Sequence, residues 1–129
     1  MAIERVIILA LIAASLISVA SAISGTATYY TVYVPSACYG YQDQGVLVAA
    51  ANRALYNNGA ACGNYYNVRC TGGTNLGVPQ PCKDGTVVRV KIVDLCPGCV
   101  DNQLDLSQEA FSTIADLNAG KILIDYTPS

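Results

Sequence analysis

Residues 87–115 read VVRVKIVDLCPGCVDNQLDLSQEAFSTIA, and this stretch decides the fold. Apolar side chains at Val88, Val90 and Ile92 alternate with the residues between them, which is the period of a strand with one buried face. Asp94 follows at the point where backbone pairing is expected to stop. We therefore predict a strand that presents an aspartate at its end.

The second half of the stretch turns the chain and starts a helix. The sequence CPGC at residues 96–99 predicts a turn, and residues 104–106 predict a short extended piece that carries Asp105. Ser107 is a suitable N-cap residue, and Glu109 falls in the first turn, where the helix dipole favours a negative charge. The predicted helix has one apolar face, formed by Ala110, Phe111, Ile114 and Ala115.

Asp94 and Asp105 are thus expected at two strand ends on either side of one loop. Two carboxylates that converge can serve as a general acid and base, as a clamp for a ligand, or as turn formers that bond their own backbone. If they share one polar site, like charges held close together raise the pKa of at least one of them. If each caps its own turn, both titrate as ordinary aspartates.

The N-terminal residues read as a leader for secretion. Arg5 supplies a positive charge, residues 6–20 are mostly apolar, and Ala20-Ser21-Ala22 has the form of a cleavage site. The apolar run is short for a membrane anchor. We therefore predict a signal peptide over residues 1–22 and one secreted domain over residues 23–129, with no membrane insertion.

Six cysteines lie in the predicted mature domain, at positions 38, 62, 70, 82, 96 and 99. An even number in a secreted domain predicts three disulfides, and six cysteines allow 15 pairings. CPGC would suit a thiol–disulfide exchanger in a reducing compartment. No thioredoxin-like pattern surrounds it here, so a structural clip is the favoured interpretation.

Composition excludes several functions. The chain has a net charge of −2 and no basic cluster, which argues against nucleic acid and anionic membranes as partners. Histidine is absent, so Ser–His and Cys–His nucleophiles and histidine metal sites are excluded. No cofactor and no metal are expected.

The remaining chain reads mainly as strands and loops. Residues 46–56 suit either a short helix or an apolar extended segment, and the following Asn57-Asn58-Gly59 tolerates positive φ angles and stops it. Further strands are predicted at residues 25–34, 64–70 and 121–126, and a loop at residues 71–85.

Six pieces of the chain, in this order, resemble one known family: GTATYY, SACYG, NNGAACGNYYNVRC, VKIVDLCPGC, LDLSQEAF and AGKILIDY. They resemble the double-psi β-barrel of expansins and family-45 endoglucanases, and most of all the single-domain plant natriuretic peptides, also called EG45-like domain proteins. The resemblance implies an all-β fold, a six-stranded double-psi β-barrel with one or two short helices. It also implies the disulfides Cys38–Cys62, Cys70–Cys82 and Cys96–Cys99.

The resemblance speaks against hydrolysis. Inverting glycosidases need an acid and a base about 6.5–9.5 Å apart. In family-45 endoglucanases the acid resembles Asp105, and the base follows the first strand. Residues 25–41 contain no Asp or Glu, so we expect no cellulase activity. A lytic transglycosylase needs no such base and stays as a less favoured alternative.

By resemblance, the protein is expected to be an apoplastic, non-hydrolytic signalling protein of the natriuretic peptide type, acting in water and ion homeostasis and in stress responses through a cell-surface receptor. The alternative is a module that binds or loosens wall polysaccharide, although the chain has no tryptophan for tight glycan binding. A monomer is expected in both cases. The residues proposed for the polysaccharide site are Thr28, Tyr29, Tyr65, Asp94 and Asp105.

Overall fold

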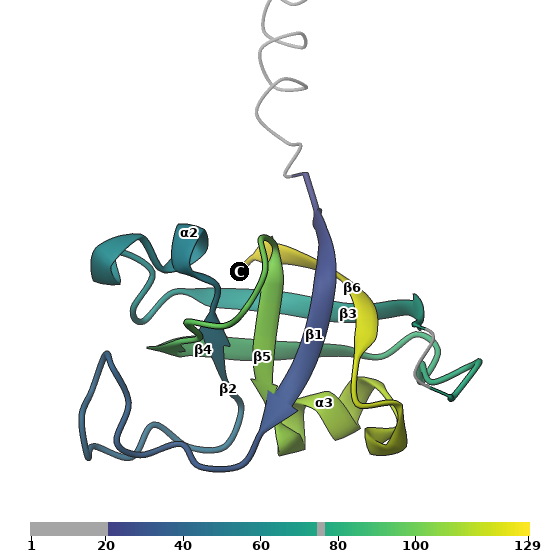
Figure 1. Cartoon of the computed structure of the whole chain (residues 1–129), viewed down its shortest axis with the longest axis horizontal. Helices are drawn as coiled ribbons and strands as arrows, with labels where there is room; N and C mark the ends of the chain where they lie inside the picture. Colours follow the sequence, from purple (N-terminus) through teal and green to yellow (C-terminus); the bar gives the residue numbers. More distant parts are fainter. Residues whose placement is uncertain (1–20, 75–76) are drawn as a thin grey trace, which may run out of the picture.

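The computed structural model describes residues 21–74 and 77–129. The predicted signal peptide, residues 1–22, lies outside the described part except for its last two residues. The described chain forms six strands and two short α-helices (Figure 1). The strands are β1 (Ile23–Tyr30), β2 (Val48–Ala51), β3 (Tyr65–Gly73), β4 (Val87–Leu95), β5 (Gln103–Ser107) and β6 (Ile122–Pro128). The helices are α2 (Arg53–Tyr56) and α3 (Gln108–Ile114), with 3₁₀ turns at Asn57–Gly59 and Leu117–Ala119.

The six strands close into a barrel in the order β1-β5-β2-β4-β3-β6. The pairs β1–β5 and β2–β4 are parallel, and the other four pairs are antiparallel. Closure leaves no strand with an unpaired edge, which removes the usual site of edge-to-edge aggregation. The predicted six-stranded barrel is confirmed.

Strand pairing shifts several predicted boundaries, among them the ends of β1 and β3. The first strand ends at Tyr30 and not at residue 34, because Tyr30 pairs with Ser107, the last residue of its parallel neighbour β5. β3 extends to Gly73, because Gly72 and Gly73 still pair with β6. Part of the predicted 71–85 loop is therefore strand.

The ambiguous segment at residues 46–56 contains both predicted alternatives. Val48–Ala51 is a buried strand, and Arg53–Tyr56 is one turn of helix. Asn52 separates them, since its side-chain oxygen accepts a hydrogen bond from the Leu55 amide and caps the helix. The predicted stop is confirmed, with positive φ angles at Asn57 and Asn58.

Helix α3 covers one end of the barrel (Figure 1). It begins as predicted, because the Ser107 hydroxyl accepts a hydrogen bond from the Ala110 amide. Phe111 and Ile114 are completely buried and pack with the inward side chains of the strands. Burying a Phe or Ile side chain contributes roughly 1.5–3 kcal/mol each. None of the helices in the described ranges has the length and apolar character to cross a bilayer.

The three disulfides have the pairing that the family resemblance implies, Cys38–Cys62, Cys70–Cys82 and Cys96–Cys99. The first joins the long β1–β2 connection to the segment that precedes β3. The second closes the β3–β4 connection, and the third closes the turn between β4 and β5.

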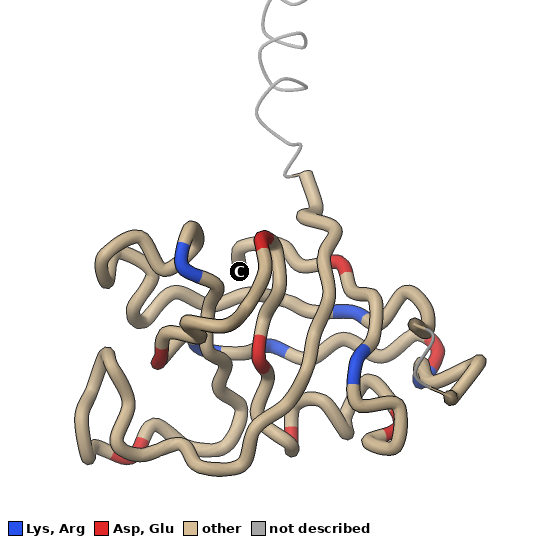
Figure 2. The backbone as a smooth tube through the Cα atoms, in the orientation of Figure 1, with Lys and Arg blue, Asp and Glu red and all other residues tan. Residues whose placement is uncertain are grey.

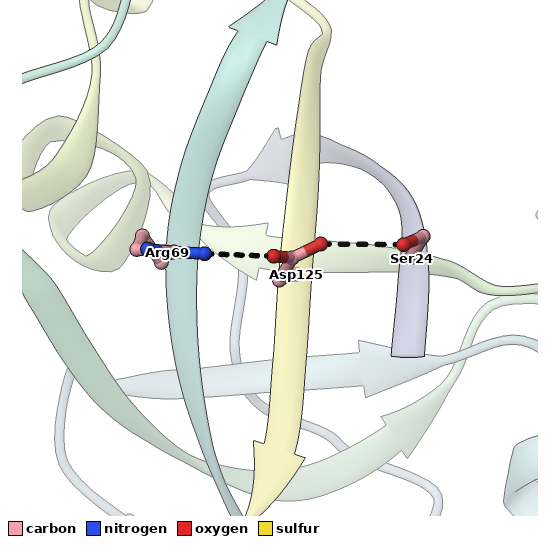
Figure 3. Close-up of polar contacts among 3 residues, drawn as sticks. All are labelled: Ser24, Arg69 and Asp125. Atoms are coloured by element: carbon pink, nitrogen blue, oxygen red, sulfur yellow. Dashed lines mark hydrogen bonds and ion pairs between the residues drawn. The ribbon is translucent and has the colours of Figure 1, made fainter. Parts of the chain in front are cut away.

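A polar row crosses the outside of β1, β6 and β3 (Figure 3). Asp125 accepts hydrogen bonds from the Ser24 hydroxyl, at 3.3 Å, and from the Arg69 guanidinium, at 2.9 Å. Within residues 21–74 and 77–129, this Arg69–Asp125 contact is the one ion pair. Since both side chains are partly exposed, the pair contributes at most about 1 kcal/mol.

Candidate functional site

Four residues on four neighbouring strands lie in one line across the outside of the barrel. Thr28 pairs in register with Asp105, Asp105 with Ala50, and Ala50 with Asp94. The residues next to Thr28, Asp105 and Ala50 in the sequence belong to the hydrophobic core, so these three side chains point away from it, although Ala50 is itself buried. We call Thr28, Asp105, Ala50 and Asp94 the carboxylate row.

A β-bulge places Asp94 in this row. Ile92 pairs with Ala49, and Asp94 pairs with the next residue, Ala50, so Val93 is the extra residue. Strict alternation from Val88 and Ile92 would turn Asp94 into the core, whereas a bulge re-aims the side chains that follow it. The sequence places Asp94 at the strand end, but its orientation depends on the bulge.

Asp105 is half-buried in the middle of the row. Its carboxylate accepts a hydrogen bond from the Thr28 hydroxyl at 2.8 Å, and Gln103 Nε2 donates to the same hydroxyl oxygen at 3.1 Å. Burial raises the pKa of Asp105 above its ordinary value, the Thr28 hydrogen bond opposes this, and the negative charge of Asp94 adds to it. The charge of Asp94 therefore reaches Asp105, as expected for a shared site.

Asp94 connects the row to the β1–β2 connection, residues 31–47. Its Oδ1 accepts hydrogen bonds from the backbone amides of Ala37 and Leu95, both at 2.9 Å. The next amide of this connection, Cys38 N–H, donates to the Val93 carbonyl at 3.0 Å. The Cys38–Cys62 disulfide fixes the same segment covalently.

Tyr30 is a site residue that the sequence analysis missed. It lies two positions after Thr28, so it is on the same face of β1. Burial, followed by the charges of Asp94 and Asp105, raises the pKa of the Tyr30 phenol well above its usual range. The hydroxyl is buried and has no hydrogen-bond partner among the described residues. Strand alternation could have found it, since an outward Thr28 implies an outward Tyr30.

Tyr29, which the sequence analysis had placed at the polysaccharide site, faces away from the row. Its ring packs against Phe111 of α3, with the ring centroids 4.9 Å apart. The alternation of β1 turns it to the opposite side from Thr28. Tyr29 thus joins the hydrophobic core and not the carboxylate row.

Tyr65 lies elsewhere on the surface. It is the first residue of β3 and pairs in register with Lys91 on β4. The Arg89 guanidinium stacks on its ring, 3.8 Å from the centroid. Of the five predicted residues, the structure therefore brings Thr28, Asp94 and Asp105 together and separates Tyr29 and Tyr65 from them.

The chemistry available to the row is limited by its residues. One partly buried carboxyl with a raised pKa, Asp105, is suited to hold or donate a proton. The β1–β2 connection supplies no carboxylate before Asp43, whose Oδ1 accepts a hydrogen bond from the Gly45 amide in a turn. All six cysteines are in disulfides, which leaves no thiol for exchange. In the part of the chain that the structure describes, no group of three or more Asp, Glu or Cys could hold a metal ion.

Comparison with known proteins agrees with this fold. A family model described as lytic transglycolase matches residues 48–126. An EG45-like domain containing protein of Citrus jambhiri is 54% identical, over 95% of this chain and 94% of its own length.

Two solved structures share the barrel. An expansin of Clavibacter michiganensis, solved in complex with cellohexaose, is 29% identical with a TM-score of 0.68. The match covers 84% of this chain and 50% of the expansin, so the chain spans about half of that protein. A papain inhibitor of Streptomyces is 28% identical with a TM-score of 0.65, over 86% of this chain and 96% of its own length. On its sequence and on its barrel, this chain belongs to the EG45-like domain family of expansin-related double-psi β-barrel proteins.

Proposed function

We propose that the protein is a secreted, non-hydrolytic module that binds a β-glucan chain of the cell wall along the carboxylate row. The observation that carries this proposal is the in-register line of Thr28, Asp105, Ala50 and Asp94 across four strands. The complex of the Clavibacter expansin with cellohexaose supports it, since that protein shares the barrel at 29% identity.

The row suits an extended, uncharged chain of sugars. It spans three strand spacings, roughly 14 Å, across the strands. Thr28 and the two aspartates offer oxygen atoms that accept hydrogen bonds from sugar hydroxyls, and a protonated Asp105 also donates one. Ala50 between the two carboxylates is buried, so the oxygen atoms of Thr28, Asp105 and Asp94 supply the polar contacts of the row.

Binding without hydrolysis follows from the missing base. Asp105 can supply an acid, but the segment from β1 to Tyr41 has no Asp or Glu that would activate a water molecule. Asp94 lies on the same face of the sheet as Asp105, and its Oδ1 is occupied by two backbone amides. A β-glucan bound on the row therefore meets one acid, with no carboxylate of the described residues on the opposite side of the chain to activate water.

The test is a binding isotherm of the mature protein on insoluble cellulose, with reducing ends measured in the same tubes. We expect saturable binding without release of reducing ends. Thr28→Val, which removes the hydroxyl that bonds Asp105, should weaken binding at least fivefold. Asp84→Asn is the control, because it removes one exposed carboxylate from the remote β3–β4 connection. Equal binding by all variants would contradict the proposed site, and release of reducing ends by the wild type would show catalysis.

A second candidate is the natriuretic-peptide type of signalling, through contact with a protein receptor. The observation in its favour is the β1–β2 connection, which exposes large apolar side chains. Tyr41 is 83% and Val32 is 70% exposed, and Val34, Val46 and Leu47 are also exposed. Exposed apolar side chains gathered in one segment are a feature of protein contact sites. The Streptomyces papain inhibitor is a related chain whose described target is a protein.

Tyr41→Ser and Val32→Ser test this candidate. Both side chains are exposed, so stability should change by less than about 0.5 kcal/mol. Saturable binding of labelled protein to plant protoplasts, weakened by both changes and unaffected by Thr28→Val, would support the receptor function. Protoplasts carry no wall polysaccharide, so absence of binding to them would contradict it and leave the glucan proposal intact.

A further inference from the structure

A cavity beside β4, the strand that also carries Asp94, has a different chemistry. It has a volume of about 420 Å³ and lies between β3, β4 and the segment that precedes β2. Arg89, Lys91 and Tyr65 form one side, Gln44 and Gly45 contribute backbone and amide groups, and Val46 and Leu47 form an apolar rim. Figure 2 marks the basic positions of β4 in blue, and Arg89 and Lys91 are two residues apart on that strand. This volume falls in the usual range for small-molecule sites.

The Arg89 guanidinium is held in place without a carboxylate partner. It stacks on the Tyr65 ring at 3.8 Å, and its Nε donates a hydrogen bond to the Ser129 hydroxyl at 2.9 Å. Among the described residues the one ion pair is that of Arg69 with Asp125, so Arg89 makes no direct ion pair with a carboxylate. Stacking on a ring leaves the terminal N–H groups of a guanidinium at its edge, where they can bind both oxygens of one carboxylate.

Lys91 provides a second positioned cation. Its ammonium donates a hydrogen bond to Gln44 Oε1 at 2.6 Å and lies 4.7 Å from the centroid of the Tyr39 ring. An ammonium has three donors, and this hydrogen bond uses one of them. Lys91 and Arg89 are two residues apart on β4, so they face the same side, roughly 7 Å apart along the strand.

The ligand that suits this cavity is a sugar with a carboxylate. Two cations without acid partners favour an anion. The exposed rim of Val46 and Leu47 offers apolar surface to the C–H face of a sugar ring. Lys91 and Asp94 are on the same strand, three residues and roughly 10 Å apart, so a polysaccharide bound on the carboxylate row could extend into the cavity.

We propose that Arg89, Lys91 and Tyr65 form a subsite for a uronic acid residue of an acidic wall polysaccharide. This proposal rests on the proposed function in that the ligand is a polysaccharide. It adds the chemical class of ligand, and it explains why an acidic protein places two unpaired cations beside two tyrosines. The carboxylate row would then bind neutral sugars, and the basic cavity would bind acidic sugars.

The experiment is calorimetric titration of the mature protein with hexagalacturonate, with fully methyl-esterified hexagalacturonate, and with cellohexaose. Arg89→Gln and Lys91→Gln should each weaken hexagalacturonate binding about tenfold or more, because each removes a charge-assisted hydrogen bond. The wild type should lose a similar factor with the methyl ester. Arg53→Gln, which removes an exposed cation on α2, is the matched control and should change nothing. Thermal unfolding of each variant checks that the fold is retained.

The outcomes separate this proposal from the proposed function. The uronate subsite would be overturned if the wild-type protein did not bind hexagalacturonate, or bound its methyl ester equally well. The same holds if Arg53→Gln weakens binding as much as Arg89→Gln. Failure of cellohexaose to bind, with hexagalacturonate binding that depends on Arg89 and Lys91, would overturn the glucan site alone.

Discussion

Removing the Cys38–Cys62 disulfide tests how the β1–β2 connection supports the carboxylate row. The two cysteines are 24 residues apart, and the chain-entropy model gives a stabilisation of about 3.5 kcal/mol for a loop of that length. For Cys70–Cys82, with a separation of 12, the same model gives about 2.8 kcal/mol. The double variants Cys38→Ser/Cys62→Ser and Cys70→Ser/Cys82→Ser should therefore lose similar amounts of stability.

The two variants should differ at the site. Ala37 N–H donates to Asp94 and Cys38 N–H donates to the Val93 carbonyl, so the first disulfide holds the hydrogen bonds that reach the row. The second disulfide closes the β3–β4 connection, which supplies none of these contacts. We therefore expect the Ala37 and Cys38 amides to lose hydrogen-exchange protection in the first variant by a larger factor than the core amide of Val68.

Urea unfolding followed by tyrosine fluorescence measures the stabilities, since the chain has nine tyrosines and no tryptophan. Amide hydrogen exchange by NMR measures the local effect. Both variants should unfold about 3 kcal/mol more easily, and the Cys70→Ser/Cys82→Ser variant should show equal losses at Ala37 and Val68. Equal losses at these two amides in both variants would show that other contacts hold the β1–β2 connection, and would contradict the role that we assign to the Cys38–Cys62 disulfide.

Three further changes have expected outcomes on stability. Gly25→Ala should destabilise the fold by about 1–3 kcal/mol in thermal unfolding, because the new Cβ would lie 2.0 Å from the Asn102 carbonyl oxygen. Gly72→Ala is the matched control and should be tolerated better, because its Cβ would have its nearest neighbour at 3.5 Å. Asp105→Asn should raise the free energy of unfolding at pH 7 and leave it unchanged at pH 3. The folded-state pKa of Asp105 is raised, so the ionised carboxylate costs stability, and this cost sets in as the pH rises above the pKa of the unfolded carboxyl, about 3.9. A loss of stability at pH 7 would contradict this expectation. Ser107→Ala should lower the free energy of unfolding in urea by about 1 kcal/mol or more, since it removes the cap of α3 and the hydrogen bond to the Val46 carbonyl. An unchanged urea midpoint would contradict both roles of Ser107.

Much of the fold could be predicted from the sequence of residues 87–115. Alternation predicted β4, the Ser107 cap predicted the start of α3, and the even number of cysteines predicted three disulfides, although their pairing needed the family resemblance. The 46–56 segment could not be resolved from periodicity, because a four-residue buried strand and a one-turn helix are both too short to show a period. The end of β1 could not be placed, because it depends on where β5 stops.

The site was predicted in part. Asp94 and Asp105 were expected to converge, and the register through Ala50 brings them to one face of the barrel. The bulge at Val93 was not visible in the sequence, since an extra residue in one strand becomes apparent only against its partner. The sequence analysis placed Tyr29 at the site and missed Tyr30, although strand alternation puts Thr28 and Tyr30 on the same face of β1.

The most direct test of the proposed function is NMR titration of carboxyl-¹³C-labelled protein with cellohexaose. We expect saturable shifts of the Asp105 and Asp94 carboxyl signals and of the Thr28 amide, with one dissociation constant, and unchanged carboxyl signals of Asp84 and Asp125. Shifts confined to residues outside the carboxylate row, or no shift at saturating cellohexaose, would contradict it.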